Sequence, residues 1–147
     1  MADRLRKDLQ IGTFANLVAK DLQKAIRMEA ADDRGICRCV TCGKKGHYKR
    51  MQGGHFVPGR RQSILFIEEN IHVQCINCNN YLSGNVMEYE RFMVNTYGKD
   101  AVDEIRALKN VVVSHTREEL AEMRDGYKQR IKTQEQRLKD FSCGFGD

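Results

Sequence analysis

Apolar residues recur with helical spacing near the start of this chain and again over its second half, while the segment between them lacks that period. Near the start, the residues that share one helical face are Phe14, Leu17, Val18, Leu22, Ala25 and Ile26. Thr13 has a side chain that can cap a helix, and Gly35 is a residue type that commonly follows a helix end. The pattern therefore predicts an amphipathic helix over Thr13–Arg34.

Three more helices are predicted in the second half of the chain. Val86–Tyr97 and Ala101–Lys109 fit helical spacing, and a third helix begins at Thr116, which forms a capping box with Glu119. This last helix carries one apolar stripe, made of Leu120, Met123, Tyr127, Ile131 and Leu138. Residues 116–140 also hold seven basic and six acidic side chains, and this balance favours a packing or dimerisation helix over one that grips DNA.

The middle of the chain, Ile36–Val73, consists of short runs bounded by glycines, which indicates strands and turns. Ile64–Ile67 and Asn70–Val73 are predicted to be extended. Val57–Arg60 has the Pro-Gly centre of a type II turn, because proline sets the first central dihedral angle and glycine accepts the positive one. Helices around a small β-rich centre predict the α+β class.

The composition is that of a folded single domain. The chain has 147 residues, of which 41% are hydrophobic and 31% charged, with a single proline. Apolar runs are too short for a membrane span, so we expect no membrane partner. The first ten residues lack the apolar centre of a signal peptide, which predicts a reducing, cytoplasmic location.

In a reducing compartment, clustered cysteines more often bind metal than form disulfides. Two C-x2-C pairs, separated by 32 residues, can complete one tetrahedral zinc site: Cys39, Cys42, Cys75 and Cys78. Such a site has no open position, so its Zn²⁺ is expected to be structural. Cys37 could replace Cys39 in a C-x4-C arrangement, while Cys143 stands alone near the C-terminus.

Positive charge is concentrated between residues 34 and 67, where eight Lys or Arg occur without a single Asp or Glu. The rest of the chain holds 17 basic and 20 acidic residues. A basic stretch of this kind suits a polyanion, and DNA is the partner we expect. The basic residues predicted to contact DNA are Lys44, Lys45, Lys49, Arg50, Arg60 and Arg61.

His55 lies near the middle of this stretch, in the sequence GGHFVPGRR. Imidazole titrates near neutral pH, so a neutral histidine can accept a proton from water. Gly53 and Gly54 add no Cβ, which would let the backbone bend and let DNA approach closely. His55 is therefore a candidate general base, and the alternatives are a structural histidine or an auxiliary zinc ligand.

The order of these residues resembles the HNH, or ββα-metal, nuclease motif: a C-x2-C pair, Gly-His, Asn70, and a second C-x2-C pair followed by Asn79. It is similar to the zinc-stapled phage junction nucleases of the endonuclease VII kind. The stretches GGHF, ENIHVQCINCN and SGN (residues 83–85) resemble more closely the NinG (Rap) recombination proteins of lambdoid phages. The resemblance covers residues 37–97.

The resemblance implies a role for each matching residue. His55 would be the general base, Asn70 would orient it by hydrogen bonding, and Asn79 would bind a catalytic Mg²⁺ or Mn²⁺ through its amide oxygen. Related nucleases often carry Asp before the histidine, where this chain has Gly54, so another ligand is required. His72, on the same strand face as Asn70 if that segment is extended, is the first candidate for metal or phosphate contact. Glu68 is the second.

The resemblance also implies an organisation and an activity. Residues 1–35 would form an N-terminal helical arm, 36–97 a zinc-stabilised HNH-like core and 98–147 a C-terminal helical region. The expected protein is a homodimeric endonuclease that acts on branched DNA, such as Holliday junctions and D-loops, in the cytoplasm of a bacterial host cell. The alternatives are a zinc-ribbon DNA-binding module without chemistry, a zinc-dependent assembly factor, and an HNH nuclease without branch preference.

Overall fold

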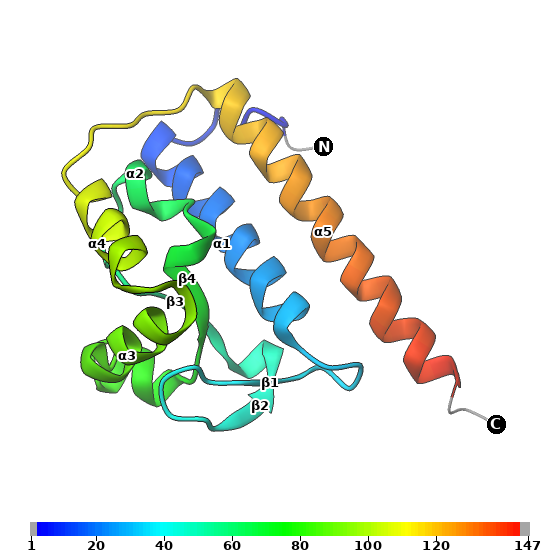
Figure 1. The fold of residues 1–147 in the computed structure, drawn as a ribbon. Helices are drawn as coiled ribbons and strands as arrows, with labels where there is room; N and C mark the ends of the chain where they lie inside the picture. The colour runs from blue at the N-terminus through cyan, green and yellow to red at the C-terminus, as the bar shows by residue number, and fades with distance from the viewer. Residues whose placement is uncertain (1–2, 145–147) are drawn as a thin grey trace.

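The computed structural model describes residues 3–144, which form helices and two small antiparallel sheets (Figure 1). In chain order the elements are α1 (Ile11–Ala30), β1 (Ile36–Arg38), β2 (Lys45–His47), β3 (Gln52–His55), α2 (Gln62–Leu65), β4 (Ile71–Gln74), α3 (Val86–Tyr97), α4 (Lys99–Leu108) and α5 (Arg117–Gly144). The predicted α+β class is confirmed.

Helix α1 lies between α5 on one side and β3 and β4 on the other (Figure 1). Phe14 and Val18 are fully buried and belong to one apolar cluster with Leu120 and Ala121 of α5. Removing such side chains from water is the main stabilising term of helix packing. The long C-terminal helix, predicted to be a packing or dimerisation helix, therefore packs against α1 within one chain.

Charged side chains of α5 reinforce this packing. The ion pairs that join α5 to α1 and to the segment just after it are Arg124–Asp21 at 2.8 Å, Arg130–Glu29 at 2.6 Å and Arg137–Asp33 at 2.8 Å. The near balance of charge on α5 thus reflects pairing with a protein surface, as predicted for a packing helix.

Helix α1 ends at Ala30, four residues before the predicted end. The Asp32 carboxylate accepts hydrogen bonds from the backbone N–H groups of Arg34 and Ile36, at 2.9 and 3.0 Å. A short acidic side chain that bonds nearby N–H groups competes with helical hydrogen bonding. The prediction of a helix to Arg34 is wrong for this reason.

Two antiparallel pairs make up the sheets. Strand β1 pairs with β2, and the loop between them carries the first cysteine pair. Strand β3 pairs with β4 in a register that sets Gly54 opposite His72 and His55 opposite Ile71. Strand β4 leads directly into the second cysteine pair, so both sheets converge on the cysteines.

The structure corrects two local predictions. Residues 62–65 form helix α2, not an extended segment, because a short apolar run carries no diagnostic period and Ile64 and Leu65 are both buried. Asn70 ends a 3-10 turn, and strand β4 begins one residue later. In the Val57–Arg60 segment Gly59 has the expected positive φ of 125°, but the Val57 carbonyl accepts a hydrogen bond from the Asn70 side chain.

The C-terminal helices agree well with the sequence pattern. Helix α3 spans Val86–Tyr97 as predicted, α4 lies within two residues of its predicted bounds, and the Thr116 hydroxyl caps α5 by accepting from the N–H of Glu119 at 3.1 Å. Among residues 3–144, no helix has the length and apolar character needed to cross a membrane.

Candidate functional site

The four predicted zinc ligands lie together. Their sulfur atoms all fall within 4.8 Å of one another, and the Sγ atoms of Cys42 and Cys75 are 3.7 Å apart. Sulfurs at the corners of a tetrahedron, each about 2.3 Å from Zn²⁺, would be separated by about 3.8 Å. The cluster therefore fits one structural metal ion, bound by Cys39, Cys42, Cys75 and Cys78.

Burial and polar groups around the cluster shift the pKa values of the thiols. Burial raises the pKa of Cys39, but hydrogen bonds with Thr41 and backbone groups outweigh burial and lower it to about 6. Burial, followed by the neighbouring thiols, raises the pKa of Cys42 to about 12. A cation would be needed to keep all four thiols deprotonated, as zinc does.

Asn85 is part of this surround, since its amide N–H donates to the sulfur of Cys78 at 3.6 Å. Residues 83–85, the SGN stretch, all have positive φ, at 50°, 94° and 48°. This backbone turn also brings the Gly84 N–H to the carbonyl of Cys78 at 2.8 Å. The stretch thus closes over the second cysteine pair.

Cys37 lies outside the cluster. Its sulfur approaches the carbonyl oxygen of Gly46 across the β1–β2 pair at 3.7 Å, and burial raises the pKa of its thiol. The C-x4-C alternative is thereby disfavoured. Cys143 is exposed at the end of α5, as expected for a cysteine without a role in the cluster.

His55 is the last residue of β3 and faces α1. It lines a groove of about 590 Å³ with residues of α1 and the loops beside it: Arg6, Leu9, Thr13, Asn16, Leu17, Ala19, Lys20, Gln23, Gly59, Arg60 and Leu65. Among residues 3–144, no carboxylate lines this groove. Arg6 is paired with Asp8, whereas Lys20 and Arg60 have no ion-pair partner within residues 3–144.

The hydrogen bond of His55 determines which ring nitrogen carries the proton. Nε2 lies 3.3 Å from the carbonyl oxygen of Leu65. A carbonyl only accepts, so in the neutral ring Nε2 carries the proton and Nδ1 retains a lone pair. Burial lowers the pKa of His55 below its ordinary value, although the bond with Leu65 opposes that shift, so the imidazole is neutral at physiological pH.

Asn70 is fully buried, and its side chain bonds backbone groups of the loop beside His55, not the His55 ring itself. Its Oδ1 accepts from the N–H of Val57 at 2.7 Å, and its Nδ2 donates to the carbonyls of Val57 at 3.0 Å and Ile64 at 3.5 Å. These bonds hold both sides of the loop that brings Leu65 to His55. The structure thus differs from the expected direct contact between Asn70 and the imidazole.

Asn79 lies in the short π-helix Asn77–Tyr81 that follows the second cysteine pair, close to where the resemblance places it. Its Nδ2 donates to Oε1 of Gln52 at 2.5 Å, which leaves Oδ1 turned toward Gly54. Since Gly54 and His55 are neighbours in a strand, they face opposite sides of it. Asn79 and His55 therefore belong to opposite faces of β3.

The two glycines before His55 are covered by side chains. A Cβ at Gly53 would lie 2.8 Å from the Cβ of Gln23 in α1, and a Cβ at Gly54 would overlap the side chain of Gln74. Both glycines are buried. The close approach that they permit is that of two glutamines, which corrects the expectation that DNA approaches there.

His72 lies in an aromatic cluster with Tyr89, Tyr97 and Phe92. The Tyr89 hydroxyl donates its proton to the carbonyl of Gly54 at 2.6 Å, so Nδ1 of His72 donates to Tyr89 and Nε2 accepts from Tyr97. Burial lowers the pKa of His72 to about 4. Both ring nitrogens are engaged without any metal.

Glu68, the other tentative metal ligand, lies on the α5 side of the molecule. Its carboxylate pairs with Arg130 at 2.7 Å, and the same guanidinium binds Glu29 of α1. The structure therefore does not bring Glu68 to Asn79, and gives it a place in the contact between α5 and the 3-10 turn before β4.

The predicted DNA-binding residues divide into separate surfaces. Arg60 lines the His55 groove, while Arg61 donates to the carbonyl of Lys109 at 3.2 Å. Lys44 and Lys45 are exposed at the β1–β2 turn, and Arg50 is exposed just before β3.

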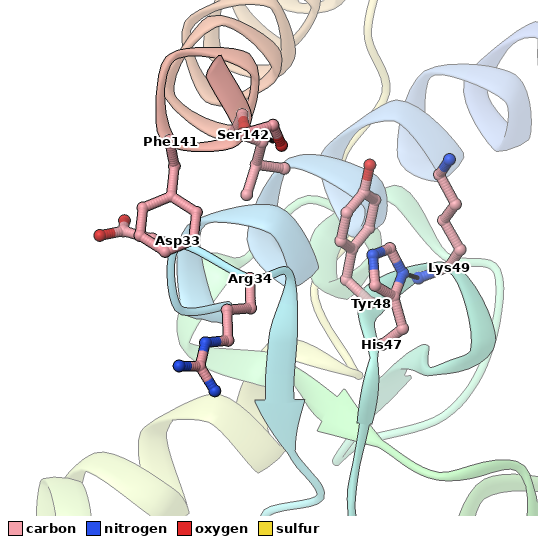
Figure 2. Close-up of a pocket in the computed structure, with 8 residues that line it drawn as sticks. Asp33, Arg34, His47, Tyr48, Lys49, Phe141 and Ser142 are labelled. Atoms are coloured by element: carbon pink, nitrogen blue, oxygen red, sulfur yellow. Dashed lines mark hydrogen bonds between the residues drawn. The ribbon is translucent and has the colours of Figure 1, made fainter. Parts of the chain in front are cut away.

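Lys49 lines a second cavity of about 480 Å³ near the end of α5. Figure 2 shows Lys49 beside His47 and Tyr48, with Arg34 across the cavity from them. This cavity is lined by residues of the turn after α1, the β2 region and α5, and His55 and Asn79 are not among them.

Sequence reasoning assigned no role to Gln74. Its Nε2 donates to the Thr41 hydroxyl at 3.2 Å and to the Gly84 carbonyl at 2.8 Å, and its side chain covers Gly54. These partners are distant in sequence, so no local pattern could reveal them. Asn85 had a weak signal, because it belongs to the SGN stretch that carries the resemblance.

Comparison with known proteins gives consistent matches. The family model described as Bacteriophage Lambda NinG protein matches residues 3–137. The chain is similar to the ninG proteins of Escherichia phage 933W (30% identical over 115 residues), Escherichia phage lambda (30% over 115 residues) and Salmonella phage P22 (28% over 113 residues). Each match covers 77% of this chain and 55–56% of the relative, so the chain spans about half the length of these curated relatives. No solved structure matches this chain.

Proposed function

This chain belongs to the NinG family of bacteriophage proteins, and we propose that it is a zinc-stabilised, metal-dependent endonuclease that hydrolyses phosphodiester bonds in branched DNA. The observation that carries the proposal is the placement of His55, a neutral imidazole with a free Nδ1 in a groove without carboxylates. The HNH relationship, inferred from motif order, belongs to the same proposal.

His55 has the properties of a general base. The Leu65 carbonyl fixes the ring through Nε2–H, so Nδ1 is the atom that accepts a proton from the attacking water. The lowered pKa keeps that nitrogen unprotonated at neutral pH. Asn70 is a positioning residue, because it holds Val57 and Ile64 on either side of the loop that supplies the Leu65 carbonyl.

The charge of the groove suits a phosphate backbone. Lys20 and Arg60 bring two cations without ion-pair partners within residues 3–144 to the groove that contains His55. Unpaired cations at a surface attract a polyanion and release its counterions when it binds. We therefore expect DNA to enter along α1 and the loop at Gly59.

Two metal sites are part of the proposal. The four-cysteine cluster is closed and would hold structural zinc, and the side chain of Asn79 offers an amide oxygen suited to Mg²⁺ or Mn²⁺. Asn79 lies on the face of β3 opposite His55, so the two groups would act on one phosphate at the end of the strand, where His55 is the last residue; an ion bound there would stabilise negative charge on that phosphate and its leaving oxygen. The preference for branched DNA is inferred from the family resemblance.

A cleavage assay tests this function. The zinc-loaded protein is incubated with linear, forked and four-way DNA in Mg²⁺ or Mn²⁺, and in EDTA as a metal-free control. We expect cleavage of branched DNA that requires the divalent ion, and a loss of about 10² or more in rate for His55→Ala, the usual scale for a lost general base.

The matched control is His47→Ala, which removes a histidine of similar burial from β2, outside the groove. His55→Ala should keep its zinc content, secondary structure and DNA affinity. If the wild-type protein binds DNA but cleaves none of the substrates, the non-catalytic zinc-ribbon alternative is the better description. If His55→Ala cleaves at the wild-type rate, His55 is not the base.

A further inference from the structure

On the face of β3 opposite His55, two side-chain amide oxygens from other segments lie close to the α-carbon of Gly54. Gly54 has no side chain, and a Cβ built there would overlap the Oε1 atom of Gln74 and lie 3.1 Å from the Oδ1 atom of Asn79. Both oxygens therefore flank the space beside the α-carbon of Gly54. The two residues come from different segments, the end of β4 and the π-helix behind the second cysteine pair.

The amide orientation of Gln74 is fixed by its partners. Its nitrogen donates to the Gly84 carbonyl, which can only accept, and to the Thr41 hydroxyl. The side chain is fully buried, and its Oε1 has no hydrogen-bond partner within residues 3–144. A buried carbonyl oxygen without a partner is uncommon and calls for a donor or a cation.

The partner of Asn79 is a second side-chain amide, that of Gln52. Asn79 donates through its nitrogen to Oε1 of Gln52, so its own oxygen is left on the Gly54 side, and no described residue donates to that oxygen. Asn79 is half-buried, whereas Gln74 lies fully buried. Two acceptor oxygens thus converge without a donor, and the half-buried residue gives access from solvent.

We propose that Gln74 and Asn79 together bind the divalent cation, and that Gln74 takes the place of the carboxylate that Gly54 cannot supply. Amide oxygens are hard donors and suit Mg²⁺ or Mn²⁺. The proposal rests on the proposed function for the identity of the ion. It adds a ligand, and it explains why position 54 is glycine, since any side chain there would displace the Gln74 oxygen.

The neutrality of this pair has a consequence for binding. Gln74 and Asn79 bring no negative charge to a dication, so the compensating charge would come from a DNA phosphate that approaches from the solvent side of the half-buried Asn79, since the two glutamines cover Gly53 and Gly54. Metal and DNA are therefore expected to bind cooperatively, each raising the affinity of the other by the same factor. A site built from carboxylates would not depend on DNA to this degree.

The test is a titration of the zinc-loaded protein with Mn²⁺, with and without four-way DNA, in which the electron paramagnetic resonance signal reports free Mn²⁺. Gln74→Met preserves side-chain volume and removes the oxygen. We expect at least a tenfold loss of Mn²⁺ affinity with unchanged zinc content. The matched control is Gln23→Met, because Gln23 covers Gly53 on the other face of β3 as Gln74 covers Gly54. That control should bind Mn²⁺ like wild type in the titration without DNA, which is the comparison that applies to it because Gln23 lines the groove proposed for DNA.

A second variant covers the case in which Gln74→Met fails to fold. Gly54→Asp combined with Gln74→Ala puts a carboxylate at the same point and makes room for it, so Mn²⁺ should bind more tightly than to wild type. No tightening in the double variant would overturn the proposal. Wild-type Mn²⁺ affinity in a folded Gln74→Met variant would also overturn it. A loss of Mn²⁺ affinity in Gln23→Met would do the same.

The outcome is separable from that of the cleavage assay. A wild-type protein that cleaves DNA while Gln74→Met binds Mn²⁺ normally would keep the nuclease and remove Gln74 from its metal site. A protein that loses Mn²⁺ affinity in Gln74→Met, but never cleaves DNA, would keep the metal site and remove the nuclease. If a water molecule bridges the two oxygens instead of a metal, the wild-type protein will show no Mn²⁺ affinity even when DNA is bound. That result also overturns the proposal.

Discussion

Replacement of Asn70 by alanine should destabilise the protein strongly, because Asn70 holds a loop by buried hydrogen bonds. The substitution removes the partners of both the N–H and the carbonyl of Val57, a residue only 6% exposed. A buried backbone group left without a partner costs about 1–3 kcal/mol. Two such groups give an expected loss of about 3 kcal/mol in the free energy of unfolding.

Urea unfolding of the zinc-loaded protein, followed by far-ultraviolet circular dichroism, measures this loss. The control is Asn80→Ala, since Asn80 is exposed and its side chain makes no hydrogen bond within residues 3–144. Cleavage by Asn70→Ala should fall about as far as in His55→Ala, because the loop would no longer fix the Leu65 carbonyl. A loss of stability no larger than that of Asn80→Ala would refute this reading of Asn70.

Asn70→Asp separates the accepting and donating roles of the side chain. The introduced carboxylate still accepts from Val57 N–H but faces the Val57 and Ile64 carbonyls without a proton to donate. Burial should raise the pKa of this carboxyl above its unfolded value, so stability is lost as the pH rises through the folded pKa. The deficit relative to wild type should therefore shrink between pH 8 and pH 5.5, and a deficit that grows on acidification would contradict the argument.

Four further predictions follow from the structure. Cys78→Ser should remove the tightly held zinc, about one ion per chain, and unfold the cysteine-centred module, as measured by elemental analysis and circular dichroism. Arg60→Ala should weaken DNA binding on unrelated sequences and reduce the slope of log K against log salt by about one, and an unchanged slope would exclude Arg60 from the DNA face. Burial holds the pKa of His72 at about 4, below its ordinary 6.5, so the unfolded state takes up a proton first. The free energy of unfolding should consequently fall by about 2 kcal/mol from pH 7 to pH 5, and His72→Phe should remove that fall. Light scattering should show a homodimer on four-way DNA, through a surface other than the buried contact between α1 and α5; a monomer there would contradict the prediction.

Features with local causes could be predicted from the sequence. The spacing of the cysteines predicted the cluster, because two residues between thiols is the separation that one metal ion requires. Helix α3 was predicted to the residue, since its apolar period is regular and Gly98 follows it. Neither prediction depended on how distant segments meet.

Features that depend on distant contacts could not be predicted. Asn70 bonds a residue 13 positions away, and His72 is held by tyrosines of α3 at separations of 17 and 25 residues. The period of an apolar run cannot separate a short helix from a strand, which is why α2 was predicted to be extended. Gln74 was missed because its side chain packs against Gly54, and a residue without a side chain gives no sequence pattern that reveals the contact.

The packing of α1 against α5 has a consequence for how this protein emerges from the ribosome. One wall of the His55 groove is α1, while the helix that covers the apolar side of α1 is synthesised about a hundred residues later. Until α5 is released, Phe14 and Val18 remain exposed, and pairing the two helices must close a loop of about a hundred residues. A nascent chain would thus expose the apolar face of α1 until α5 has left the ribosome, so the packing behind the histidine groove would be completed only then.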